Sequence, residues 1–183
     1  MGEAVWRVIA ARGADAVTVR EVAIEAGVST GVLSHYFASR QQMLLHALQL
    51  SYRRAGERIQ RCIDRNEDPD KALREALRSI LPMTDEQALE YRVWLCFWGH
   101  AVGDRDLDAA NSAGYERTIT SFELLIRLCQ QAGTIRPNLK ARREARALVA
   151  VVDGLAVQAV LGKGLAADEQ MAIVDATLQR LRP

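Results

Sequence analysis

Hydrophobic positions recur every three or four residues along almost the whole chain, and no stretch alternates regularly between apolar and polar residues. A period near 3.6 is typical of an α-helix with one buried face, whereas strict alternation would indicate a half-buried strand. The pattern therefore predicts an all-α protein. Helices are expected at 2–12, 40–65, 70–81, 84–102, 106–132, 140–161 and 167–181, with two short ones between 18 and 36 and a tight turn at 162–164.

The two short helices lie between Thr18 and Tyr36. Thr18 is followed three residues later by Glu21, the capping-box spacing, in which the glutamate would bond back to the N–H of Thr18. Gly27 supplies a left-handed residue between the helices, and Ser29 is placed to cap the second one. The predicted inner face of the second helix is Val32, Leu33 and Tyr36. This arrangement is a helix-turn-helix, which binds DNA, although an ordinary helical hairpin without a ligand is the alternative.

The outward positions of the second short helix are small or polar, so its backbone could approach the edges of DNA bases closely. We expect five residues to face the major groove: Ser29, Thr30, Gly31, Ser34 and His35. We expect Thr18, Tyr36 and Arg40 to bind phosphates, which sets the position of the protein on DNA without reading its sequence. Arg20 is a further predicted DNA contact.

The residues that follow resemble a known family. After Tyr36 and Phe37, Ser39 is placed to cap a long helix, with Gln42 three residues later. From Val5 to Leu48 the chain resembles the DNA-binding domain of TetR-family repressors, with Arg40 at a position where the family carries a lysine. The resemblance implies a homodimer that binds a palindromic, double-stranded DNA operator and is released by a small-molecule inducer.

The helix expected at 140–161 is apolar nearly all round after Ala145. Such a helix must be covered on more than one side, and the helix at 167–181 covers only one. We therefore expect these two helices to pair with those of a second copy in a four-helix bundle, the alternative being burial within a monomer. The predicted dimer contacts are Leu148, Val152, Leu155, Ala159, Val174 and Leu178.

Aromatic residues make up 5% of the chain, yet several gather on the helix at 84–102. Tyr91, Trp94 and Trp98 are spaced to share one face. They could be ordinary core, but the resemblance implies an inducer site in this half of the chain, and aromatic faces suit an apolar or cationic molecule. The predicted ligand contacts are Tyr91, Trp94, Phe97, Trp98, His100 and Phe122.

Three segments narrow the resemblance further. GVSTGVLSHYF, WLCFW and VVDGL are similar to the choline-responsive repressors of glycine-betaine synthesis genes. Those repressors carry a tryptophan soon after Asp-Gly-Leu, where this chain has Ala156, so choline is one candidate ligand among several. Asp153 in the same segment is either a counter-ion for a cationic ligand or a structural carboxylate.

Composition bounds these expectations. The 183 residues are 49% hydrophobic and 26% charged, which is typical of a globular protein, and we expect two domains, 1–46 and 47–183. The net charge of +1 is low for a DNA-binding protein, so we expect modest affinity and clear salt sensitivity. The chain has no run of eighteen apolar residues, which a membrane span would need. The three scattered cysteines suit a reducing cytoplasm.

Known catalytic arrangements are absent from the sequence pattern. His35, His46 and His100 lack the spacing of metal ligands, and no phosphate-binding loop is present. We therefore expect no enzyme, no metal and no cofactor. The leading hypothesis is a ligand-responsive repressor. The alternatives are a small-molecule-binding helical protein with a weak or vestigial DNA-binding domain, and a constitutive DNA-binding protein whose aromatic stripe is plain core.

Overall fold

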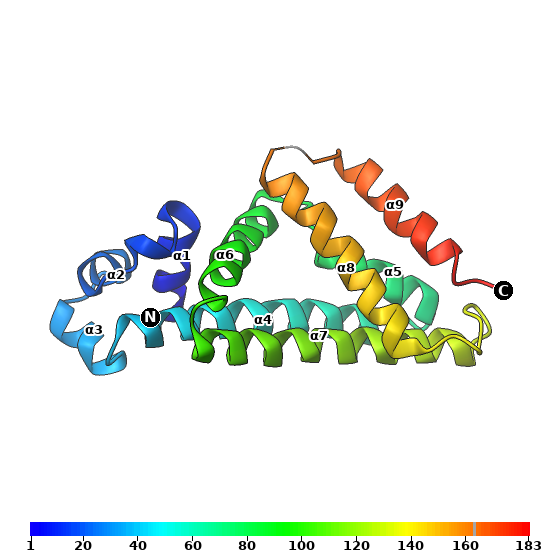
Figure 1. Ribbon diagram of the computed structural model, residues 1–183, viewed down its shortest axis with the longest axis horizontal. Coiled ribbons are helices and arrows are strands. Elements are labelled where there is room, and N and C mark those ends of the chain that lie inside the picture. The colour runs from blue at the N-terminus through cyan, green and yellow to red at the C-terminus, as the bar shows by residue number, and fades with distance from the viewer. Residues whose placement is uncertain (163) are drawn as a thin grey trace. The chain divides into compact units, whose positions relative to one another are not determined.

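The computed structural model describes residues 1–162 and 164–183, and within them every regular element is a helix (Figure 1). The all-α prediction is confirmed, although the tight turn predicted at 162–164 includes Lys163, which lies outside the described residues. The elements are α1 (Gly2–Arg12), η1 (Ala14–Ala16), α2 (Val19–Ala26), α3 (Thr30–Tyr36), α4 (Arg40–Arg65), α5 (Pro69–Ser79), α6 (Asp85–Ala101), α7 (Arg105–Gln131), α8 (Ala141–Val160) and α9 (Ala167–Gln179).

The chain forms two compact units. One contains Met1–Arg53 and Leu89–Gly114, and the other contains Arg54–Ala88 and Tyr115–Pro183, so that α4, α6 and α7 each contribute to both. The boundary expected after residue 46 stays a prediction, and the packing of α4 on its neighbours continues beyond that residue. The indole N–H of Trp6 in α1 donates to the buried Ser51 hydroxyl of α4 at 3.1 Å.

The helix-turn-helix in the first unit forms as the capping residues predict. The Thr18 hydroxyl accepts from the Glu21 N–H at 3.1 Å, and Gly27 ends α2 in the left-handed conformation, with φ of 67°. The expected return bond from Glu21 to the Thr18 N–H is not formed in the described part of the chain. The Glu21 carboxylate instead pairs with the Arg12 guanidinium at 2.6 Å, where a full positive charge is available.

Helices α5, α8 and α9 pack together in the second unit. Asp68 caps α5 and Pro69 occupies its first turn, where a missing N–H costs nothing. The buried face of α5 is Ala72, Leu73, Ala76 and Leu77. The Arg74 guanidinium donates two hydrogen bonds, of 2.6 and 2.8 Å, to the Asp175 carboxylate and so ties α5 to α9.

Candidate functional site

Helix α3 is anchored through one of its seven residues and presents the others to solvent. Leu33 is its only buried residue, and Phe37, which follows the helix, is also buried. The five residues predicted to face the groove are all exposed: Ser29, Thr30, Gly31, Ser34 and His35. The outer surface of α3 is therefore accessible enough for the helix to enter the major groove of DNA.

Two residues assigned to the inner face of α3 were placed wrongly. Val32 is 44% exposed and Tyr36 is 62% exposed. Leu33 and Phe37, four residues apart, carry the packing of this short helix. Val32 and Tyr36 precede them by one position each and are therefore rotated by about 100° around the helix axis, away from the core. The exposure of Tyr36 agrees with its other predicted role, as a phosphate contact.

The hydroxyl groups that cap α2 and α3 remain able to donate. Thr18 Oγ1 and Ser29 Oγ each accept a backbone N–H, from Glu21 and Val32. A hydroxyl group has one donor in addition to its two acceptor lone pairs, so each still has an O–H to offer to a phosphate oxygen. Arg20 is exposed beside Thr18 on the first turn of α2.

Arg40 has a structural role that the sequence did not indicate. Its Nε donates to the Val17 carbonyl at 3.1 Å, and its Nη2 donates to the Ala14 carbonyl at 2.8 Å. These bonds join the start of α4 to the segment between α1 and α2. The guanidinium is partly exposed, and its contact with a DNA phosphate stays a prediction.

An aromatic cluster lies in the first unit, which also contains the helix-turn-helix. The Tyr91 and Trp94 rings of α6 meet edge to face, with centroids 5.0 Å apart, and the Tyr52 ring of α4 lies 5.6 Å from that of Trp94. The Tyr52 hydroxyl donates to the Asn111 side-chain oxygen at 2.8 Å. Gly114 of α7 packs against the Tyr52 ring so closely that an added Cβ would overlap it. The Tyr52 ring is thus fixed between α7 and the Trp94 ring.

Trp94 carries an unusual polar group within this cluster. The residue is 6% exposed, and its indole N–H has no hydrogen-bond acceptor among the residues that the structure describes. A buried donor without an acceptor costs about 1–3 kcal/mol, so such a group usually meets a water molecule or a ligand. The N–H of Trp94 therefore marks a position where an acceptor atom would be favourable.

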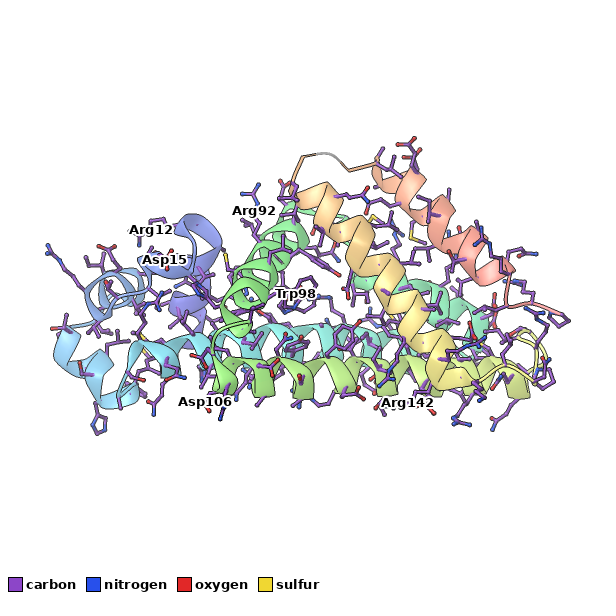
Figure 2. The ribbon with its side chains drawn as sticks, in the orientation of Figure 1. Arg12, Asp15, Arg92, Trp98, Asp106 and Arg142 are labelled. Atoms are coloured by element: carbon purple, nitrogen blue, oxygen red, sulfur yellow. The ribbon has the colours of Figure 1, made fainter. Side chains whose placement is uncertain are left out.

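The six residues predicted as ligand contacts are distributed over both compact units, and their shared contact with a ligand stays a prediction. Tyr91, Trp94 and Phe97 are buried along α6 in the first unit, and Trp98, labelled in Figure 2, is half-buried on the same helix. Phe122 is fully buried in the second unit. Sequence reasoning missed Tyr52, which lies more than thirty positions from the aromatic run and looked like an ordinary inward residue of α4.

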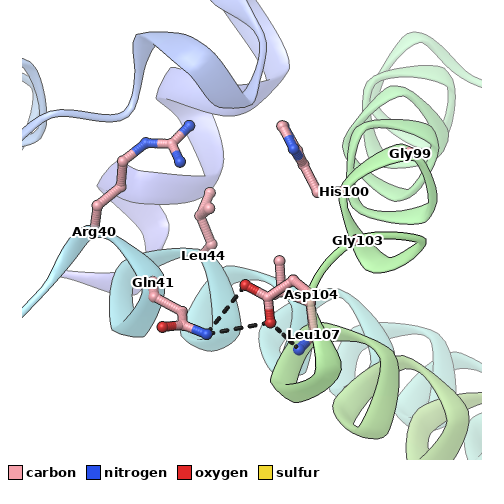
Figure 3. A pocket seen from close by; sticks show the side chains of 8 residues that line it. All are labelled: Arg40, Gln41, Leu44, Gly99, His100, Gly103, Asp104 and Leu107. Carbon is pink, nitrogen blue, oxygen red and sulfur yellow. Dashed lines mark hydrogen bonds between the residues drawn. The ribbon is translucent and has the colours of Figure 1, made fainter.

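His100 belongs to a different place from the three rings. It lines a polar pocket of about 410 Å³ with Arg40, Gln41 and Asp104, among others (Figure 3). The Gln41 side-chain amide donates to both carboxylate oxygens of Asp104, at 3.2 and 3.1 Å. Asp104 also accepts from two backbone N–H groups at the start of α7, each at 3.0 Å. This carboxylate both caps α7 and connects it to the first turn of α4.

Asp153 has a partner that favours its structural interpretation. The Tyr115 hydroxyl hydrogen-bonds the Asp153 carboxylate, and burial, followed by the charge of Asp153, raises the pKa of this tyrosine. A carboxylate that already accepts a phenolic O–H is less available as a counter-ion for a ligand. Ala156, three residues after Asp153, is fully buried. It stands where the choline-responsive repressors carry a tryptophan.

Most of the residues predicted for the dimer contact are buried by contacts within a single chain. Leu148, Val152, Leu155, Val174 and Leu178 are buried in the isolated chain, and Ala159 is half-buried. They are the intramolecular face of α8 and α9, because the apolar pattern does not say which of several apolar faces packs internally. After its arginine-rich first turns, α8 exposes Ala147, Ala150, Gly154 and Gln158, and Leu161 directly after the helix is also exposed. The homodimer and its contact residues stay predictions.

In residues 1–162 and 164–183, no helix is long and apolar enough to cross a membrane. The same residues contain no group of three or more His, Cys, Asp or Glu side chains that could hold a metal ion.

Comparison with known proteins gives consistent matches. A family model described as "Bacterial regulatory proteins, tetR family" matches residues 3–47, and one described as "BetI-type transcriptional repressor, C-terminal" matches residues 69–183. The chain is 32% identical over 161 residues to the HTH-type transcriptional regulator PksA of Bacillus subtilis (strain 168), which covers 88% of this chain and 77% of that protein. It is 30% identical over 139 residues to the HTH-type transcriptional regulator BetI of Stenotrophomonas maltophilia (strain R551-3), covering 75% and 68%.

A solved structure is similar over nearly the full length. It is a crystal structure of a transcriptional regulator from Saccharomonospora viridis in complex with choline. The TM-score is 0.88 and the sequence identity is 27%, with 97% of this chain and 93% of that chain covered.

Proposed function

Because the chain belongs to the TetR family of transcriptional regulators, with a C-terminal region of the BetI type, we propose that it represses transcription by binding a palindromic operator as a homodimer. The observation that carries this proposal is the exposed outer surface of α3, which a single residue, Leu33, anchors to the rest of the helix-turn-helix. Such a helix can enter the major groove while the core behind it stays intact.

Residues around α3 divide into two groups in this proposal. Thr30, Gly31, Ser34 and His35 lie on the exposed surface and would meet the base edges. The hydroxyl groups of Thr18 and Ser29, with Arg20, Tyr36 and the exposed part of Arg40, would bind phosphates on either side. Phosphate contacts place the helix in the groove, and the base contacts select the sequence.

We propose that the inducer is a small quaternary ammonium compound with a hydrogen-bond acceptor, such as choline. The faces of Tyr52, Tyr91 and Trp94 would attract the cation through their negative π-surfaces, and the unpaired N–H of Trp94 would donate to the acceptor. The choline complex of the Saccharomonospora viridis regulator supports this ligand class. The hydroxyl oxygen of choline would satisfy the one polar group that the cluster leaves without an acceptor in the described chain.

The proposed dimer uses the exposed faces of α8 and α9. Ala147, Ala150 and Gly154 are small and exposed on α8, so two copies of this helix could approach closely. Leu161 and Ile173 are large, exposed apolar residues at the end of α8 and on α9, and they would become buried in the same contact. Two reading helices per particle would then match a palindrome. We further propose that the protein acts in the cytoplasm, without enzymatic activity.

A DNA-binding titration tests these proposals together. Fluorescence anisotropy would measure binding to labelled duplexes from the region flanking the protein's own gene, at two salt concentrations and with or without choline. Bound inducer is expected to weaken operator affinity by about 5- to 150-fold, the usual range of allosteric coupling. Higher salt should weaken binding to every duplex.

Matched variants make the inducer part specific. Trp94→Phe keeps a ring but removes the N–H, so it should weaken the response to choline while operator binding without choline persists. Trp98→Phe, on the same helix but outside the described ring contacts, is the control and should respond like the unmodified protein. Specific binding to a duplex that choline never weakens would reject this ligand class. Choline binding without any specific DNA binding would favour a ligand-binding protein with a vestigial helix-turn-helix.

A further inference from the structure

Val32 is an apolar side chain at the centre of an otherwise polar surface. It is 44% exposed, and its exposed neighbours three or four positions away, on the same side of the helix, are Ser29, His35 and Tyr36. Its backbone N–H donates to the Ser29 hydroxyl, so the turn of helix that carries it is fixed by the cap. The exposed part of its isopropyl group faces solvent on the surface proposed to meet DNA.

The surroundings of Val32 permit a close approach. Gly31, directly before it, has no side chain, and a Cβ at that position would meet only the Ser29 hydroxyl oxygen, at 3.8 Å, among the described atoms. A β-branched residue in a helix holds essentially one χ1 rotamer, so Val32 presents two methyl groups in a fixed position. Binding to that side chain would cost little additional side-chain entropy.

One base offers the matching chemistry in the major groove. The edges of guanine, cytosine and adenine present hydrogen-bond donors and acceptors there, whereas thymine adds a 5-methyl group. Val32 has no side-chain donor or acceptor, so it cannot read the polar atoms of any base. Its isopropyl group against a thymine methyl would remove apolar surface of both partners from water.

Other exposed apolar residues of this unit do not fit that role. Ile24 is 65% exposed, but it lies on α2, which crosses the backbone in a helix-turn-helix instead of entering the groove. Tyr36 stands at the last position of α3 and has a hydroxyl group suited to phosphate. Val32 is in the first half of α3, from which a recognition helix contacts base edges.

We propose that Val32 selects a thymine in each operator half-site through contact with its 5-methyl group. This inference rests on the proposed function and names one element of its sequence specificity. It predicts that the protein distinguishes thymine from deoxyuridine, which has the same hydrogen-bonding groups and lacks only that methyl.

The test begins with operator duplexes selected from a random pool by the full-length protein. Each thymine is then replaced by deoxyuridine, in both half-sites at once, and affinity is measured by anisotropy. One buried methyl group changes an association constant roughly fourfold, so the paired replacement should weaken binding about 15-fold at the contacted position. Val32→Ala should weaken binding to the thymine duplex and make the protein indifferent to the replacement at that position.

Ile24→Ala is the control, because it removes an exposed apolar side chain from the neighbouring helix, 65% exposed against 44% for Val32. It should keep the full thymine-to-deoxyuridine difference. Since Val32 is 44% exposed, its variant should stay folded with at most a small change in unfolding temperature, and circular dichroism would check this. A deoxyuridine penalty that survives unchanged in Val32→Ala, or the absence of any penalty in a protein that binds its operator, would overturn the proposal. Failure to select any specific duplex would overturn the proposed function itself.

Discussion

Gly114 offers a direct test of how tightly the aromatic cluster is built. This glycine lies in α7, and a Cβ added to it would overlap three atoms of the Tyr52 ring. Gly99 is the matched position, because it also lies in a helix of the first unit, yet a Cβ there would meet no described atom within 4 Å. The two alanine variants therefore share the same backbone effect and differ in packing alone.

The expected free energies follow from this difference. Replacing glycine by alanine inside a helix stabilises the folded state by about 0.5–1 kcal/mol, and Gly99→Ala should gain up to that amount. Gly114→Ala receives the same gain, but forcing a methyl group into a packed ring costs about 1–3 kcal/mol. If the ring shifts, its hydrogen bond to Asn111 is also lost, at about 1 kcal/mol. Gly114→Ala should therefore be less stable than Gly99→Ala by about 1–4 kcal/mol.

Urea denaturation at one fixed protein concentration would measure both variants, followed by the fluorescence of Trp6, Trp94 and Trp98, of which Trp94 lies beside the Tyr52 ring. The concentration must be matched because dimerisation would add to apparent stability. Equal stability of the two variants would refute the reasoning, since it would mean that the Tyr52 ring moves away at no cost. In that case the cluster could not hold its rings in place for a ligand either.

Three other outcomes are expected. Arg40→Met should lower stability by about 1–3 kcal/mol in a urea titration, because two backbone carbonyls lose a charged donor; unchanged stability with reduced DNA affinity would mean that Arg40 acts on phosphate alone. Gly154→Trp should convert the dimer to monomer in sedimentation velocity, and an unchanged dimer would place the contact elsewhere. The hydrogen bond from Arg146, with the charge of Arg142, lowers the pKa of Glu116 below its ordinary value, so its stabilisation is present above that value and lost as pH falls through the folded-state pKa. Acid titration of Arg142→Gln/Arg146→Gln should therefore show a smaller loss of stability below about pH 4.5 than the unmodified protein.

Helix positions were predictable because their signals are local. Thr18, Ser29 and Gly27 stand where the backbone needs a cap or a left-handed residue, and these requirements depend on a few neighbours only. The helical spacing of apolar residues, which continues over residues 40–65, likewise predicted the bounds of α4. Such features need no knowledge of what packs against the helix.

The failures concern which side of a helix meets which neighbour. Val32 and Tyr36 looked like core because they are apolar or aromatic, but Leu33 is enough to anchor this seven-residue helix, with the buried Phe37 directly after it. On α8 several faces are apolar, so the pattern could not tell the internal face at Leu148 from the exposed one at Gly154. A long-range partner such as Tyr52 has no sequence signal at all, because its meeting with Trp94 depends on the crossing of two helices.

The narrow attachment of α3 has a consequence for how operator preference could change over evolution. Folding of the helix-turn-helix depends on Leu33 and on the residues around the turn, while the outward positions of α3 carry little of that burden. Substitutions there could accumulate without an unfolded intermediate, so a duplicated gene could acquire a new operator in a few steps. The same separation would let an engineer randomise the outer surface of α3 and expect most library members to remain folded.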